Sequence, residues 1–134
     1  MHHALGDAVR PLALNTVAAN VFTEPEIATV GWTQDSVESG EFPARTVMLP
    51  LATNARAKMQ GLRDGFVKLF CRSGTGIVMG GVVVAPRASE LIFPISLAVD
   101  SQLSVDQLAH AFTVYPSMSG SLAEAARLLR LRTE

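Results

Sequence analysis

The first two thirds of the chain contain short apolar runs, whereas apolar residues at helical spacing occur only in the last third. Side chains on one face of a strand recur at every second position, as Val47 and Leu49 do, so these runs predict strands. The tripeptide Ser73-Gly74-Thr75 separates two such runs and is typical of a hairpin. The expected strands cover residues 17–22, 26–32, 44–51, 65–72 and 76–85.

Helical signals begin with residues 33–40, a polar segment ending in Gly40 that predicts a short helix. We expect residues 54–59 to form one irregular turn. Pro86 is placed where a helix starts, and it precedes an apolar stripe at residues 91, 95 and 98. Pro94 interrupts that stripe, and it predicts a kink because proline cannot donate the backbone hydrogen bond of a helix interior.

Two serines have the spacing of a capping box, in which Ser or Thr precedes Glu or Gln by three residues. Ser104 precedes Gln107, and Ser121 precedes Glu124. We therefore expect one helix to start after Ser104 and another near Ser121. Strands followed by helices predict an α+β domain, with a largely antiparallel sheet and flanking helices.

Composition narrows the classes of function. The 134 residues fit one domain, and 11 Lys and Arg against 12 Asp and Glu give a formal net charge of −1. Nucleic-acid binding needs a clustered basic surface, so no nucleic-acid partner is expected. No apolar run is long enough to span a bilayer, and the first residues lack a secretory pattern, so no membrane partner is expected. The single cysteine, Cys71, excludes an intrachain disulfide and favours a reducing, cytoplasmic location.

Few residues carry a recognisable catalytic or binding motif. The glycines between 74 and 81 lack the Lys-Ser/Thr ending of a phosphate-binding loop, and Gly80-Gly81 indicates a bulge or a close backbone approach. No cysteine–histidine spacing fits a metal site, so no metal is expected. His110 near a helix end is expected to be a structural surface residue, and Cys71 a buried one.

The segment beginning at Tyr115 is the strongest candidate for a site. Pro116 fixes its own φ and restricts Tyr115 to an extended conformation, so the tyrosine cannot belong to a helix. An alanine-rich helix follows within a few residues. The sequence therefore predicts a polar aromatic side chain held rigidly in front of a helix.

Four segments together resemble a known family, the pyridine nucleotide-disulfide oxidoreductases, in their C-terminal dimerisation domain. That family includes lipoamide dehydrogenase, glutathione reductase and mercuric reductase. The match runs in order from about Asn15 to Arg130. Its segments are Val21-Phe22-Thr23-Glu24-Pro25-Glu26-Ile27-Ala28-Thr29-Val30-Gly31, Gly65-Phe66-Val67-Lys68-Leu69, Gly80-Gly81-Val82 with Ala88-Ser89-Glu90-Leu91-Ile92, and Tyr115-Pro116-Ser117.

The resemblance implies a dimerisation domain over residues 15–131, with residues 132–134 as a tail. Residues 1–14 look like the flexible end of a preceding FAD-binding domain. In the family, FAD and NAD(P) are bound by regions outside this domain, so the chain is expected to be a piece of a longer protein. It is expected to form a homodimer and complete the partner's active site, and to be inactive alone.

The chain departs from the family at the residues that handle dithiols. Those members carry His-Pro followed by Glu, and here Tyr115 and Gly120 stand at the two positions. A phenol, with an ordinary pKa of about 10, is a poor base near neutrality. The resemblance therefore implies an NAD(P)H oxidoreductase with a non-dithiol acceptor such as a quinone.

Two other functions stay open. One is a dihydrolipoamide dehydrogenase or other disulfide reductase with a different base, and the other is a free-standing interaction module. The resemblance also implies that the Tyr115 carbonyl faces the partner's flavin, next to Pro116, and that the Tyr115–Pro116 peptide is cis.

Overall fold

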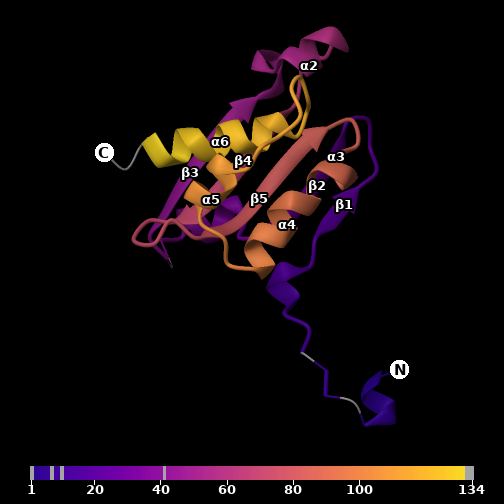
Figure 1. The fold of residues 1–134 in the computed structure, drawn as a ribbon, viewed down its shortest axis with the longest axis vertical. Helices are drawn as coiled ribbons and strands as arrows, with labels where there is room; N and C mark the ends of the chain where they lie inside the picture. The colour runs from indigo at the N-terminus through magenta and orange to yellow at the C-terminus, as the bar shows by residue number, and fades with distance from the viewer. Residues whose placement is uncertain (1, 7, 10, 41, 132–134) are drawn as a thin grey trace.

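A computed structural model describes residues 2–6, 8–9, 11–40 and 42–131. In this part of the chain, five antiparallel strands form one sheet in the order β1-β2-β5-β4-β3. Helices pack on one face of it (Figure 1), which confirms the α+β prediction. The strands are β1 Ala19–Val21, β2 Glu26–Gly31, β3 Ala44–Pro50, β4 Phe66–Arg72 and β5 Val78–Ala85.

The strands lie where the apolar runs predicted them, although β4 begins one residue later, at Phe66, and β1 and β5 begin two residues later. β1 starts at Ala19 because residues 14–16 form a 3₁₀ turn, η2 Leu14–Thr16, closed by the Thr16 N–H donating to the Ala13 carbonyl. β5 starts at Val78 rather than Gly76, since Ile77 instead forms an isolated bridge with Ser104.

Short helices connect the strands. The expected helix after Thr33 is α1 Gln34–Glu38, with Thr33 and Ser36 forming a reciprocal capping box. The irregular turn expected at residues 54–59 is wrong: after η3 Leu51–Thr53, the chain forms α2 Ala55–Met59. The helix forms because the Asn54 side chain accepts a hydrogen bond from the Ala57 N–H, and the following residues are good helix formers.

The proline-interrupted stripe forms two helices, α3 Ala88–Leu91 and α4 Phe93–Asp100, which confirms the disruption predicted at Pro94. Pro94 lies in the first turn of α4, where a missing N–H costs little. α5 Val105–His110 starts with the expected capping box between Ser104 and Gln107. α6 Gly120–Leu131 follows a loop and ends the described chain.

The core lies between the sheet and α3–α6. Val67, Leu69 and Val83 face the helices from β4 and β5, and Ile95 and Leu129 meet them from α4 and α6; all five are fully buried. α6 crosses β3 and β4, while α4 crosses β5 and β2 (Figure 1). The sheet thereby supports both helices and the loop that precedes α6.

The close approach predicted at Gly80-Gly81 is confirmed. A Cβ atom at Gly81 would lie 2.8 Å from the Lys68 carbonyl oxygen and 3.0 Å from Ile95 Cδ1. A Cβ at Gly80 would collide with the backbone of Trp32. These glycines therefore let β4 and α4 pack against β5, and their role is structural.

The N-terminal segment includes η1 His2–Leu5 and projects away from the sheet in Figure 1. Leu5, Leu12 and Leu14 are exposed in it. The domain bounds at residues 14–15 and 131–132 stay predictions, and the predicted tail, residues 132–134, lies outside the described residues. Residues 1, 7 and 10 of the predicted FAD-domain end also lie outside them.

Candidate functional site

Tyr115 lies in the loop between α5 and α6, and 84% of its surface is exposed. The peptide that joins it to Pro116 is cis, as expected. Phe112 and Val114 in the same loop are also exposed, as are Phe93 and Leu97 on the side of α4 that faces away from the sheet. Large apolar side chains are therefore exposed both in this loop and on α4. Exposed apolar side chains of this size are a feature of binding interfaces.

The predicted capping box at Ser121 and Glu124 is wrong. α6 already begins at Gly120, whose N–H donates to Ser117 Oγ at 3.1 Å. Ser121 lies inside the helix and is buried, while Glu124 forms an ion pair with Arg127 at 2.7 Å. Ser121 is not the cap because it already lies inside α6, and its hydroxyl instead accepts a hydrogen bond from a distant part of the chain.

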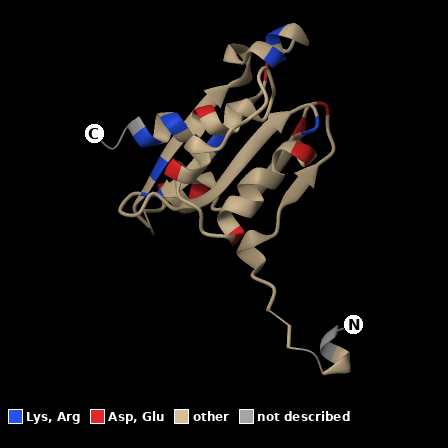
Figure 2. Cartoon of the chain, in the orientation of Figure 1, with Lys and Arg blue, Asp and Glu red and all other residues tan. Residues whose placement is uncertain are grey.

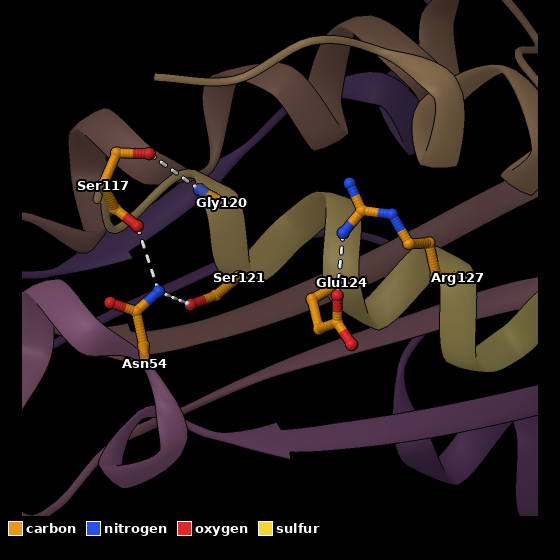
Figure 3. Close-up of polar contacts among 6 residues, drawn as sticks. All are labelled: Asn54, Ser117, Gly120, Ser121, Glu124 and Arg127. Atoms are coloured by element: carbon orange, nitrogen blue, oxygen red, sulfur yellow. Dashed lines mark hydrogen bonds and ion pairs between the residues drawn. The ribbon is translucent and has the colours of Figure 1, made fainter. Parts of the chain in front are cut away.

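The residue that donates this hydrogen bond is Asn54. Its Nδ2 atom lies 2.8 Å from Ser121 Oγ and 3.0 Å from the Ser117 carbonyl oxygen. Figure 3 shows the amide between the end of the Tyr115 loop and the first turn of α6. Our sequence reasoning missed Asn54 as a site residue. Its position directly before a run of helix formers was the only local signal, and that signal indicates only a helix cap.

A groove of about 570 Å³ lies beside this contact. Tyr115, Pro116 and Gly120 line it from the loop and α6, His110 and Arg127 contribute polar groups, and Asn54 lies on its other side. A Cβ atom at Gly120 would lie 3.5 Å from Ser117 Oγ and 3.7 Å from Thr113 Oγ1, which are ordinary contacts. The groove therefore has room for a side chain at this position.

Some other titratable groups near the helices have structural partners. His110 Nδ1 lies 2.7 Å from the Asp106 carbonyl oxygen, and Arg130 pairs with the Asp106 carboxylate at 2.9 Å. His110 is exposed on the surface, as expected. The Ser89 N–H donates to Glu26 Oε2 at 2.9 Å and lowers the pKa of that carboxyl. Burial raises the pKa of the Cys71 thiol, which confirms its reading as a structural residue.

The described residues offer little for a bound metal or nucleotide. Among them, no group of three metal-ligating side chains comes together. Their clustered glycines, residues 74–81, lie in and around the β4–β5 hairpin rather than in a loop between a strand and a helix. In the same described part, no helix has the length and apolarity needed to cross a membrane.

The five-stranded antiparallel sheet with helices on one face is an α+β fold, and the comparison with known families identifies its class. The chain belongs to the family described as pyridine nucleotide-disulphide oxidoreductase, dimerisation domain, whose model matches residues 17–126. Members of this family are flavoproteins that use NAD(P)H, and they form homodimers. The family predicted from the sequence motifs is confirmed.

Two curated relatives illustrate the range of activities. The chain is 61% identical over 129 residues to the NAD(P)H dehydrogenase (quinone) of Mycobacterium tuberculosis, covering 96% of this chain and 26% of that protein. It is 35% identical over 121 residues to the dihydrolipoyl dehydrogenase of Halobacterium salinarum, covering 89% and 26%. The chain thus spans about a quarter of the length of these relatives.

Solved structures agree with this assignment. The crystal structure of LpdA from Mycobacterium tuberculosis matches with a TM-score of 0.93 at 61% identity, covering 96% of this chain and 28% of that chain. The HOCl-induced flavoprotein disulfide reductase RclA from Escherichia coli matches with a TM-score of 0.85 at 26% identity, covering 95% and 29%.

Proposed function

We propose that this chain is the homodimerisation domain of an FAD-dependent NAD(P)H oxidoreductase whose electron acceptor is a quinone rather than a dithiol. In this proposal the domain completes the active site of the partner subunit. The observation that carries it is the exposed Tyr115–Pro116 segment, which stands where dithiol-handling relatives carry His-Pro. The 61% identity to an NAD(P)H dehydrogenase (quinone) supports the same acceptor.

The outer side of the helical layer supports dimer formation. Phe93 is 66% exposed and Phe112 fully exposed, although both are large apolar side chains. Figure 2 shows few charged positions along α4, and the loop at residues 111–119 contains none. Burial of these side chains in a self-complementary interface would remove apolar surface from water without desolvating a charge.

The Tyr115 segment fits contact with a flavin but not the binding of a whole dinucleotide. The Tyr115 carbonyl accepts no hydrogen bond from the described part of the chain, so it is available to a hydrogen-bond donor outside the domain. The glycines at 80 and 81 are required by strand packing and form no phosphate cradle. In this arrangement FAD is held elsewhere in the parent protein, and Tyr115 with Pro116 closes one side of its site.

The proposed electron acceptor follows from the residues that stand at the family's acid/base positions. FAD, when bound in the parent protein, would supply the chemistry that transfers two electrons from NAD(P)H to an acceptor. Reduction of a disulfide also needs a group that protonates and deprotonates thiols, and relatives use the His–Glu pair. Here a phenol and a glycine occupy those positions, and a quinone does not require thiol activation. Tyr115 is then able to contact the acceptor or donate a hydrogen bond to it.

The test uses the longer protein that contains this chain. NADH and NADPH oxidation is measured with menadione, lipoamide and glutathione disulfide as separate acceptors. We expect menadione turnover with either cofactor and no disulfide turnover. Turnover of lipoamide, with none of menadione, would instead support a disulfide reductase with a different base. The 134-residue chain alone should sediment as a dimer, and a monomer at high concentration contradicts the interface.

A further inference from the structure

The Asn54 carboxamide uses its polar atoms on three different backbone or side-chain partners. Its Oδ1 atom accepts a hydrogen bond from the Ala57 N–H at 3.1 Å, which caps α2. Its Nδ2 atom donates to the Ser117 carbonyl and to Ser121 Oγ. One side chain therefore joins the start of α2 to the Tyr115 loop and to the start of α6, both of which lie more than 60 residues later in the sequence.

Asn54 itself is attached to the sheet. Leu51, three residues earlier, is fully buried, and its N–H donates to the Gly65 carbonyl at 3.0 Å, next to the start of β4. The Asn54 N–H donates to the Leu51 carbonyl at 2.9 Å. The backbone that carries the Asn54 carboxamide is therefore held against the sheet and is not a free loop.

The contact between Asn54 and Ser117 holds the backbone next to Tyr115 in place. Only Pro116 separates the two residues, and its ring fixes φ. The Ser117 hydroxyl also accepts from the Gly120 N–H, so Ser117 is held from the loop side and the helix side together (Figure 3). Tyr115 has no comparable anchor of its own, since its side chain is largely exposed.

We propose that Asn54 is a positioning residue, which sets the place of Tyr115 at the site shared between subunits. The expected effect of Asn54 on catalysis rests on the proposed function, whereas its effect on the position of Tyr115 does not. Asn54 touches no reacting atom. It acts through Ser117 and Ser121, by keeping the Tyr115 loop and the start of α6 in one fixed arrangement.

The variant Asn54→Asp separates positioning from helix capping. Aspartate caps a helix as well as asparagine, so α2 is retained. It has no N–H groups, so the hydrogen bond to the Ser117 carbonyl is lost, whereas the Ser121 hydroxyl can turn to donate to the new carboxylate. The variant Ser121→Ala removes only the α6 half of the contact. Thr33→Asp, a change at the remote cap of α1, is the matched control.

Tyr115 is the only tyrosine in the chain, which makes a single-site readout possible. The 134-residue chain is labelled with 3-fluorotyrosine and observed by ¹⁹F NMR, with circular dichroism as the check on folding. We expect the Tyr115 resonance to shift or broaden in Asn54→Asp, less so in Ser121→Ala, and to stay unchanged in Thr33→Asp. An unchanged resonance in Asn54→Asp overturns the inference.

The catalytic part is measured in the longer protein by stopped-flow, one half-reaction at a time. We expect Asn54→Asp to slow flavin reoxidation by menadione about tenfold, the effect of a lost hydrogen bond expressed at the transition state. Flavin reduction by NADH or NADPH should be unchanged, because the residue acts through the Tyr115 loop. Ser121→Ala should give a smaller loss, and combining the two changes should add little.

The outcomes are distinguishable. If the wild-type protein does not reduce menadione, the proposed function fails, and the ¹⁹F result alone decides whether Asn54 positions Tyr115. If the wild type turns over but reoxidation in Asn54→Asp is unchanged, Asn54 is not a positioning residue for the reaction. Equal slowing of both half-reactions indicates a general loss of structure and also overturns the inference.

Discussion

Gly120 is the position at which the resemblance to dithiol-handling enzymes implies a glutamate, and Gly120→Glu is predicted to stabilise the domain. The backbone there is not in the left-handed region, so the geometry does not require glycine. A new Cβ would meet Ser117 Oγ at 3.5 Å and Thr113 Oγ1 at 3.7 Å, without a collision. The remainder of the side chain would enter the groove of about 570 Å³.

The size of the expected stabilisation follows from two effects at the first residue of α6. Replacing glycine in an allowed conformation reduces the entropy of the unfolded chain and contributes about 0.4–1 kcal/mol. A carboxylate in the first helical turn interacts favourably with the helix dipole and adds about 0.3–1 kcal/mol. Together they predict a gain of about 1 kcal/mol, or a rise in Tm of roughly 3–5 °C for a domain of this size.

Scanning calorimetry of the 134-residue chain measures this change, with Gly120→Ala and Gly120→Lys as controls. Alanine tests the entropy effect alone, and lysine reverses the charge near the helix dipole. The expected order of Tm is Glu, then Ala, then Lys. A Tm below wild type for both Glu and Ala would refute the reasoning, because it would mean that the backbone at this position does require glycine.

Three further predictions concern the interface, the core and pH. Phe112→Asp should weaken the dimer by about 2 kcal/mol, a rise in Kd of roughly 30-fold that sedimentation can measure. The control is Met48→Asp, which should leave the Kd unchanged because Met48 is exposed on the opposite face of the sheet. Leu129→Ala removes a fully buried side chain and should lower the free energy of unfolding by about 2–5 kcal/mol in urea titrations, and a loss under 1 kcal/mol contradicts its core position. The hydrogen bond from Ser89 lowers the pKa of Glu26 below its ordinary 4.5, so its stabilising contribution is present above pH 4.5 and is lost as pH falls through the folded pKa. The stability difference between wild type and Glu26→Gln should therefore shrink on acidification, and a constant difference would argue against this linkage.

Local patterns predicted the elements whose signals lie within a few residues. Alternation located the strands, the polar segment ending in Gly40 predicted α1, and the spacing of Ser104 and Gln107 predicted the capping box of α5. The same reasoning failed at α2 and at the start of α6. The only local signal for α2 was the Asn54 cap before a run of helix formers, and several serines near Gly120 offer competing local caps.

The amino-acid sequence by itself determined the family, the antiparallel α+β plan and the Tyr115–Pro116 segment, because these depend on motifs and on periodicity along the chain. Only the tertiary structure decided which serine caps α6 and what holds the Tyr115 loop. The hydrogen bonds from Asn54 span more than 60 residues, and no local pattern records a contact across that separation. The partners of this partly buried amide depend on which groups lie near it after the sheet and helices have packed.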